Sequence, residues 1–297
     1  MSSRNKAYLL LLGTAIIWGV ASPIVKYTIQ YIPPLQMLTY RFAISSVIAV
    51  ILFPSYRRHL PKTISAWGWT ILYGFIVSTV TLSLFFVGIK YSSSLVAGMS
   101  SVLQPILAGV AGVFVLKEHI TKREKTGIGI ALFGSLIITL EPLLKDGHFL
   151  GTLLGNLMLL GSRIFDTISS IMAKFILRTK VSPLALTQIS FIIGFISMLP
   201  IVLLSNEKWQ MLNVPVGAHL GTWFMAIFSG TIAYTWWHQA EKSIEVGEAT
   251  MSYYLHPLFA APLALLWLHE RLSPLFLVGC LVTAAGVLLA EAKPQRS

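Results

Sequence analysis

The chain has 297 residues, of which 55% are hydrophobic and only 11% are charged. A typical soluble domain has about 25% charged residues, so most of this surface is expected to face lipid. The net charge of +11 does not indicate a nucleic-acid partner, because the basic residues sort by membrane side, and the single cysteine excludes an intrachain disulfide or a cysteine-based metal cluster.

Long apolar runs follow one another along the whole chain. A helix of about 20 mostly apolar residues crosses a bilayer, and the sequence predicts about ten such helices. They cover residues 7–28, 34–53, 66–88, 94–116, 124–141, 149–173, 183–204, 219–240, 249–268 and 274–290. The first run is interpreted as a retained helix, because it continues past Trp18 without a convincing signal-peptide cleavage site. Barrel strands would alternate in polarity, which these runs do not.

The basic residues are unequally divided between the two sides that such helices define. If the N-terminus is cytoplasmic, 14 Lys and Arg residues lie in inside segments and 4 lie in outside segments. The positive-inside rule then predicts that both termini are cytoplasmic. The expected location is a plasma membrane, best matched by a prokaryotic inner membrane, which the chain crosses several times.

An internal repeat divides the chain into two units, expected at 1–145 and 146–297. Pairs separated by 152 residues, or by 148 near the start of each unit, share residue type: Pro105 and Pro257, Glu118 and Glu270, Gly127 and Gly279, Gly134 and Gly286, Gly13 and Gly161, Ser22 and Ser170, Lys26 and Lys174. Each unit holds five predicted helices, and because five is odd the second unit must be inverted. The predicted fold class is therefore an all-α membrane protein with a 5+5 inverted repeat, which is a transporter architecture.

These motifs resemble those of the EamA-type drug/metabolite transporters. The resemblance covers nearly the whole chain as two consecutive EamA-like units. The residues that carry it are Trp18-Gly19, Ser22-Pro23, Lys26, Gln104-Pro105, Leu116-Lys117-Glu118, His256-Pro257 and Leu268-His269-Glu270. It implies ten helices around a central cavity lined by the first, third, fourth, sixth, eighth and ninth. It also implies a carrier of small metabolites such as amino acids. The halves differ where Asp166-Thr167 replaces Trp18-Gly19.

Polar side chains within the predicted helices are the candidates for binding substrate. The candidate cavity residues are Trp18, Ser22, Ser100, Ser101, Gln104, Arg163, Asp166, Ser170, Tyr234, Trp237, His238, Tyr253 and His256. Those in runs 94–116 and 249–268 share a helix face next to a proline, and they either line a cavity or link helices by hydrogen bonds. The aromatic residues of run 219–240 either stack on substrate or form an interfacial belt.

Charged residues inside predicted helices have competing interpretations. Asp166 is the only acid placed deep in a run, and it either relays protons or pairs with Arg163 three residues before it. Arg41 either contacts an anionic substrate or pairs with backbone carbonyls. Lys26 and Lys174 are expected to share a structural role near helix ends.

Two further sets of repeated residues are expected to be structural. Glu118 and Glu270 end helices where the dipole disfavours acids, so they need partners such as loop amides. Gly127 and Gly134, and their counterparts Gly279 and Gly286, are seven apart and allow close helix packing within one chain or in a dimer.

The sequence favours a secondary-active transporter of an amino acid or related compound, in the export direction. No nucleotide-binding loop, catalytic motif, metal site or cofactor site is predicted. The alternatives are a carrier of anionic sugar- or nucleotide-linked metabolites, using Arg41 and Arg163, a membrane-embedded enzyme, or a pore or scaffold. The expected partners are a small-molecule substrate and the lipid bilayer, with no nucleic acid, and the chain is expected to be a monomer or homodimer.

Overall fold

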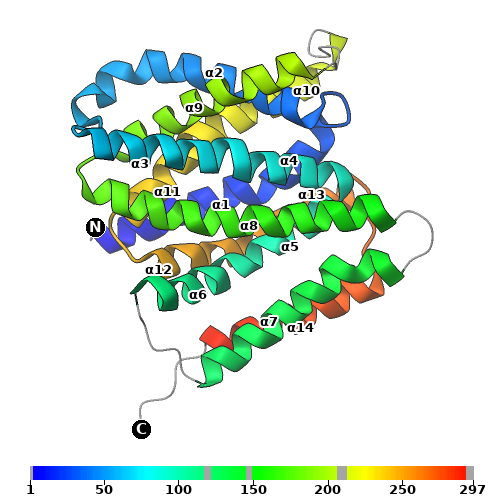
Figure 1. Ribbon diagram of the computed structural model, residues 1–297. Helices are drawn as coiled ribbons and strands as arrows, with labels where there is room; N and C mark the ends of the chain where they lie inside the picture. Colours follow the sequence, from blue (N-terminus) through cyan, green and yellow to red (C-terminus); the bar gives the residue numbers. More distant parts are fainter. Residues whose placement is uncertain (1–2, 117–121, 145–148, 206–212, 292–297) are drawn as a thin grey trace.

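The computed structural model describes residues 3–116, 122–144, 149–205 and 213–291 (Figure 1). All regular structure in these residues is helical. The first half contains α1 (Ser3–Thr28), α2 (Pro34–Tyr56), α3 (Ile64–Gly74), α4 (Leu82–Tyr91), α5 (Ser94–Ser100), α6 (Gln104–Leu116) and α7 (Lys122–Leu140). The second half contains α8 (Phe149–Arg178), α9 (Pro183–Leu204), α10 (Val216–Phe224), α11 (Ala233–Glu241), α12 (Val246–Thr250), α13 (His256–Leu266) and α14 (Pro274–Glu291).

Several of these helices have the length and composition of membrane spans. Six helical stretches are long and apolar enough to cross a bilayer: Ser3–Thr28, Pro34–His59, Ile64–Tyr91, Ser94–Ala111, Pro183–Leu204 and Val216–Glu241. Shorter apolar helices cover Lys125–Leu140 and Pro274–Ala290. Large apolar side chains point outward on these surfaces, with Val50 72% and Leu204 83% exposed, as expected where lipid is the solvent. The chain is therefore a multi-pass helical membrane protein.

Each predicted run is helical, but four of them are interrupted. A π-helical segment, Phe75–Thr81, joins α3 to α4, and a second one, Met225–Ile232, joins α10 to α11. Segments of 3₁₀-helix, Ser101–Leu103 and Met251–Leu255, precede α6 and α13. The 3₁₀ segments follow from Pro105 and Pro257, whose missing N–H removes a helical hydrogen bond one turn earlier.

The pair formed by α7 and α14 lies at one edge of the molecule in Figure 1. A Cβ atom at Gly127 would lie 2.5 Å from the Ala290 nitrogen and 2.7 Å from the Gly286 oxygen. A Cβ atom at Gly134 would lie 2.9 Å from the Gly279 oxygen. Because Gly127 meets Gly286 and Gly134 meets Gly279, the two helices run antiparallel with their backbones in contact. The predicted glycine faces are therefore used within one chain.

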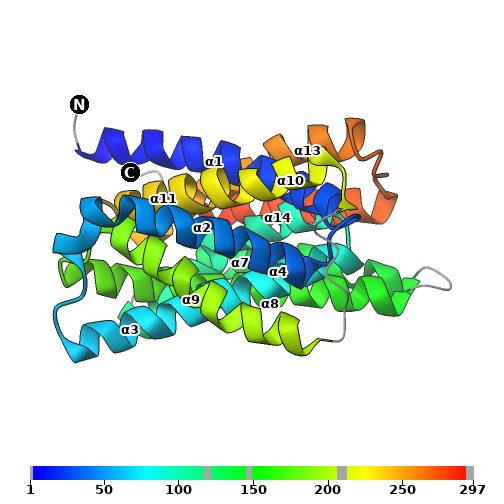
Figure 2. The ribbon, with the colours of Figure 1, turned by 90° about the horizontal axis from the view of Figure 1, so that it is seen from above.

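The helices α1 to α5 and α8 to α11 share one core of buried apolar side chains, in which α2 lies against α9 (Figure 2). Phe42 of α2 and Phe191 of α9 are fully buried and stack with ring centroids 5.7 Å apart. Next to this stack, α1 crosses the bundle and contacts α11 and α13. The arrangement brings the middle of α1, the π segments and the proline breaks together.

Candidate functional site

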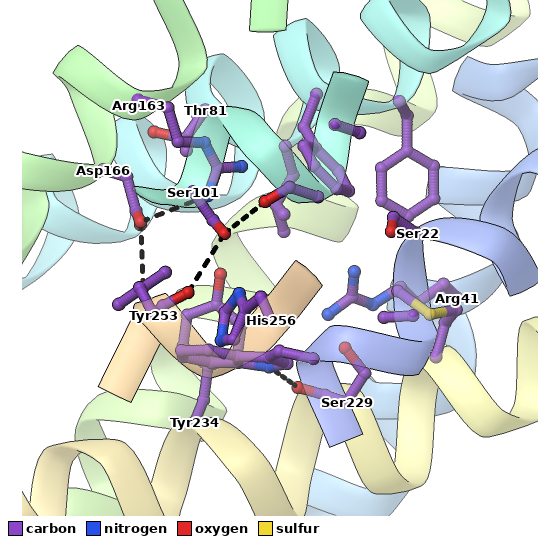
Figure 3. Close-up of a pocket in the computed structure, with 18 residues that line it drawn as sticks. Ser22, Arg41, Thr81, Ser101, Arg163, Asp166, Ser229, Tyr234, Tyr253 and His256 are labelled. Carbon is purple, nitrogen blue, oxygen red and sulfur yellow. Dashed lines mark hydrogen bonds and ion pairs between the residues drawn. The ribbon is translucent and has the colours of Figure 1, made fainter. Parts of the chain in front are cut away.

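A small cavity of about 70 Å³ lies where helices from both halves of the chain meet (Figure 3). Its polar and aromatic lining consists of Trp18, Ser22, Arg41, Thr81, Ser101, Arg163, Asp166, Ser229, Tyr234, Tyr253 and His256. Its apolar lining consists of Ala21, Leu82, Phe85, Phe86, Ala97, Gly98 and Met225. Polar groups from several helices thus converge on one concave site beside apolar side chains, as they do in small-molecule sites.

Irregular helix geometry brings several of these residues to the cavity wall. Thr81 ends one π segment, and Met225 and Ser229 belong to the other. The indole nitrogen of Trp18 donates to the Ser229 carbonyl oxygen at 3.0 Å, which fixes α1 against the second π segment. Widened turns of this kind occur often at functional sites.

Asp166 of α8 lies at one end of the cavity with two polar partners. The Tyr253 hydroxyl donates to Asp166 Oδ2 at 3.0 Å, and Arg163 Nη1 lies 4.0 Å from the same oxygen. Arg163 also lies over the Phe85 ring, 5.0 Å from its centroid. Asp166 is thus both paired with Arg163, although loosely, and placed in the cavity wall, so its two predicted roles are compatible.

Arg41 of α2 reaches the cavity from the side opposite Asp166 (Figure 3). It has no solvent exposure, and none of its three guanidinium nitrogens has a hydrogen-bond partner in the described part of the chain. The guanidinium carbon lies 5.8, 5.8 and 5.4 Å from the ring centroids of Phe42, Phe86 and Phe191. Each cation–π contact is worth about 0.5–2 kcal/mol, whereas burying a charge costs several kcal/mol.

The sequence left two roles open for Arg41, contact with an anionic substrate or pairing with backbone carbonyls, and did not include it in the set of candidate cavity residues. The only signal was its depth in the run 34–53, and that signal does not tell which side of the helix faces a cavity. Its guanidinium has no carbonyl partner in the described part of the chain.

An aromatic wall forms around Trp18. Its ring centroid lies 4.9 Å from that of Tyr234, 5.9 Å from that of Tyr253 and 6.3 Å from that of His256. His256 is buried, and its Nε2 has no hydrogen-bond partner among the residues described. The wall can therefore offer a ligand aromatic surface and also an unpartnered imidazole nitrogen, that of His256.

Eight of the predicted residues line the cavity, namely Trp18, Ser22, Ser101, Arg163, Asp166, Tyr234, Tyr253 and His256, and the other five lie elsewhere. His238 bonds Tyr73 at 2.7 Å and Thr187 at 2.9 Å, and Gln104 bonds Thr167 at 3.2 Å.

The other three are buried or bonded within a helix. Ser100 donates to the Ala97 oxygen at 2.8 Å, Trp237 is buried beside Ala7 and Leu11, and Ser170 is buried on α8.

The repeated lysines share a structural role, as predicted. Lys26 Nζ donates to the Ile89 oxygen at 2.8 Å and also to the Ser92 oxygen. Lys174 Nζ donates to the backbone carbonyl oxygens of Glu241 and Ile244, each at 2.5 Å. Each lysine therefore caps the carbonyl end of a helix.

Glu270 has backbone-amide partners, at the start of α5 in the other half. Its Oε1 and Oε2 accept from the amides of Ser94 at 2.8 Å and Leu95 at 3.0 Å. An acid at a helix N-terminus is favourable. Its predicted counterpart, Glu118, lies outside the described residues.

Asp166 is not the only buried acid in the described part of the chain, although the second one lies at the end of a span and not deep within it. Glu241, the last residue of α11, has no solvent exposure. The sequence placed it in the polar break that follows the run 219–240, and its repeat counterpart is the apolar Ile89, so the repeat gave no signal.

These features define the class of protein: a helical membrane protein that encloses a polar cavity between its two halves. The chain belongs to the EamA-like transporter family, whose model matches residues 5–140 and again residues 153–291.

Proteins that are similar to this chain over almost its whole length are named as transporters. The Bacillus subtilis protein "Uncharacterized transporter YyaM" is 24% identical and covers 96% of this chain and 93% of its own. An Archaeoglobus fulgidus "Uncharacterized transporter" is 26% identical, covering 97% and 99%. The Salmonella typhimurium "Probable amino-acid metabolite efflux pump" is 22% identical, covering 97% and 95%. Membership of this family makes the chain a membrane transporter, and the family implies a small-molecule substrate.

A solved crystal structure shares the fold. It is 18% identical in sequence, superposes with a TM-score of 0.68, and covers 99% of this chain and 100% of its own.

Proposed function

We propose that this transporter is a secondary-active carrier that exports an amino acid or a related small metabolite across the plasma membrane by alternating access. The observation that carries the proposal is the cavity, because its polar lining comes from both repeat units and includes one buried acid and two buried arginines. The name of the Salmonella relative, an amino-acid metabolite efflux pump, supports the substrate class and the direction.

The proposed architecture has ten spans in two inverted units, 1–145 and 146–297, with both termini cytoplasmic. The reciprocal contacts of Gly127 with Gly286 and of Gly134 with Gly279 support it, because an inverted copy would place equivalent helices antiparallel. The matching lysine caps support it as well. The substrate path then lies within one chain, whether or not the protein forms a dimer.

The proposed site consists of the predicted residues that line the cavity, with Arg41 added. The second candidate function, a carrier of anionic sugar- or nucleotide-linked metabolites, rests on Arg41 alone, because Arg163 faces Asp166. The small cavity volume also favours a compact metabolite over a nucleotide sugar.

Thiol labelling tests alternating access without knowledge of the substrate. Cys280, the only cysteine, is replaced by Ala, and Ser22→Cys puts one thiol in the cavity wall. A membrane-impermeant thiol reagent should label it from either face of oriented membrane vesicles. Val50→Cys, on the lipid-facing side of α2, is the control that should stay unlabelled. Labelling of Ser22→Cys from one face only would contradict alternating access.

A further inference from the structure

Arg41 is a buried cation with an unused set of hydrogen-bond donors. Its three nitrogens lack acceptors within the described residues, and its side chain is aimed into the cavity (Figure 3). A guanidinium offers a planar fork of N–H groups that matches a carboxylate. The neighbouring Phe rings interact with the charge but accept no conventional hydrogen bond. The site is therefore electrostatically incomplete without a ligand.

The charges of the cavity lining do not balance. Two arginines and one aspartate line it, and Asp166 is paired with Arg163. No second acid lines the cavity in the part of the chain that the structure describes, since the buried Glu241 is not among the lining residues. One positive charge, on Arg41, is left for a ligand. A single carboxylate would neutralise it, whereas a phosphate dianion would bring a second charge with no free cation to meet it.

The surroundings of Arg41 set the character of the rest of the ligand. The cavity wall near it is apolar or aromatic, with Phe86, Met225 and Tyr234 in the lining. The volume of about 70 Å³ is below the roughly 300 Å³ at which typical ligand pockets begin. The lining fits an apolar or aromatic body, and the volume restricts it to a compact one. A phenyl ring requires this closed cavity to widen, because benzene fills a cavity of about 150 Å³.

We propose that the transported molecule is a monoanion, with one carboxylate on a compact apolar or aromatic body, and that Arg41 binds this carboxylate. The proposal rests on the transport function proposed above and moves its substrate class from the amino acids to related carboxylates without a charged amine. A net charge of minus one distinguishes this ligand from a zwitterionic amino acid.

Four probes on one phenyl skeleton separate the charge states. They are phenylacetate, its neutral isostere phenylacetamide, the zwitterion phenylglycine and the cation phenylethylamine. At equal ligand concentration, a ligand that binds more tightly to the folded protein raises its melting temperature more, with the logarithm of the ratio of ligand concentration to Kd. Phenylacetate should raise it most, phenylglycine less, and the amide and the amine not at all. The proposal would be overturned if phenylacetamide stabilised the protein as much as phenylacetate does. It would also be overturned if none of the four compounds raised the melting temperature.

Variants of Arg41 test whether this residue makes the contact. Arg41→Gln should weaken phenylacetate binding about 10- to 100-fold, as expected for a lost charged hydrogen bond. The affinity of Arg41→Lys should lie between those of wild type and Arg41→Gln, because lysine keeps the charge but lacks the planar fork of N–H groups. Arg178→Gln, at the exposed end of α8, is the matched control and should bind as wild type.

The melting temperature of the ligand-free variant separates a ligand-binding arginine from a structural one, because the two roles predict opposite changes when Arg41 is replaced. Arg41→Gln should melt above wild type, because it removes a buried, unpaired charge. A lower melting temperature with unchanged phenylacetate binding would show that Arg41 is structural and overturn the proposal. If Arg41→Gln does not fold, unchanged binding by Arg41→Lys serves the same purpose.

The thiol-labelling result keeps the two proposals separate. Two-sided labelling of Ser22→Cys with no effect of Arg41 on binding would refute only the carboxylate contact. One-sided labelling would refute alternating access whatever the Arg41 variants do.

Discussion

Ser101 and Tyr253, which are 152 residues apart and equivalent in the internal repeat, touch each other. The Ser101 hydroxyl lies 3.3 Å from the Tyr253 carbonyl oxygen and shares its one proton between this oxygen and the Gly98 carbonyl oxygen of its own helix, at 2.6 Å. The Tyr253 carbonyl lies four residues before Pro257, which has no N–H to donate to it. Equivalent residues of two copies can meet only where the copies face each other, so both proline breaks and the cavity beside them belong to the junction of the two halves.

Ser101→Ala should therefore destabilise the protein, because the Tyr253 carbonyl loses a donor from the facing helix. Interhelical hydrogen bonds in membranes contribute about 0.6–2 kcal/mol, and thermal unfolding in lipid nanodiscs would measure the loss. Ser100→Ala is the matched control, since the Ser100 hydroxyl bonds only the Ala97 carbonyl of its own helix. Equal effects of the two substitutions would contradict the special role of Ser101.

Periodicity and the repeat predicted the helices well, because apolar runs report burial in lipid directly. The runs ended within five residues of the observed helices, the largest difference being 173 against Arg178 for α8. The 3₁₀ segments could be anticipated from Pro105 and Pro257. The π segments could not, because no glycine or proline signal distinguishes Phe75–Thr81 from ordinary helix.

The site was only partly predictable, because sequence gives a helix face but not its neighbour. Tyr234 and His238 share a face of α11, yet only Tyr234 reaches the cavity, while His238 is held between Tyr73 and Thr187. For the same reason, the sequence could not decide between the two roles of Arg41 and did not indicate that Glu241 is buried. Their burial depends on which helices pack against α2 and α11.

Asp166→Asn should abolish gradient-driven uptake into liposomes while leaving substrate exchange intact. Asparagine keeps the size of the side chain and can still accept from Tyr253, but it cannot bind and release a proton. Uptake driven by a proton gradient and counterflow without a gradient measure the two activities. Tyr253→Phe is the companion variant, because it removes only the hydrogen bond to Asp166. Unchanged uptake by Asp166→Asn would assign Asp166 a structural role.

Tyr234→Ala and Trp237→Ala should have different effects although they lie on one helix. Tyr234 lines the cavity, so its loss should weaken substrate binding. Trp237 is 3% exposed and does not line the cavity itself, but it packs behind two lining residues, with ring centroids 5.5 Å from Trp18 and 5.1 Å from Tyr253. Its loss should therefore cost about 3–5 kcal/mol of stability and affect binding less than the loss of Tyr234. Binding isotherms and thermal unfolding of both variants separate the two effects. A binding defect confined to Trp237→Ala would contradict the placement of the site.

Glu270→Gln should loosen the turn between α4 and α5. Glu270 accepts from two backbone amides on one side of this turn, and Lys26 donates to three backbone carbonyls on the other, those of Ile89, Lys90 and Ser92. Hydrogen bonds to a charged group contribute about 1.5–3 kcal/mol, so a loss of that order is expected in thermal unfolding. Glu245→Gln is the control, because Glu245 is exposed and makes no cap at the start of α12. An unchanged thermal stability of Glu270→Gln would show that the turn is held by packing alone.

Gly127→Ala should separate α7 from α14, whereas Gly129→Ala should not. The added methyl at Gly127 would lie 2.5 Å from a backbone nitrogen of α14, and backbone cannot move aside as a flexible side chain can. The helices must shift apart, at the cost of the close contacts that hold membrane helices together. A methyl at Gly129 would meet no atom within 4 Å, so this variant should be neutral, or stabilising by up to about 1 kcal/mol through helix propensity. Crosslinking between cysteines placed on α7 and α14, with thermal unfolding, compares the two. If both variants crosslink and unfold as wild type, the reciprocal glycine contact does not set the packing of this pair.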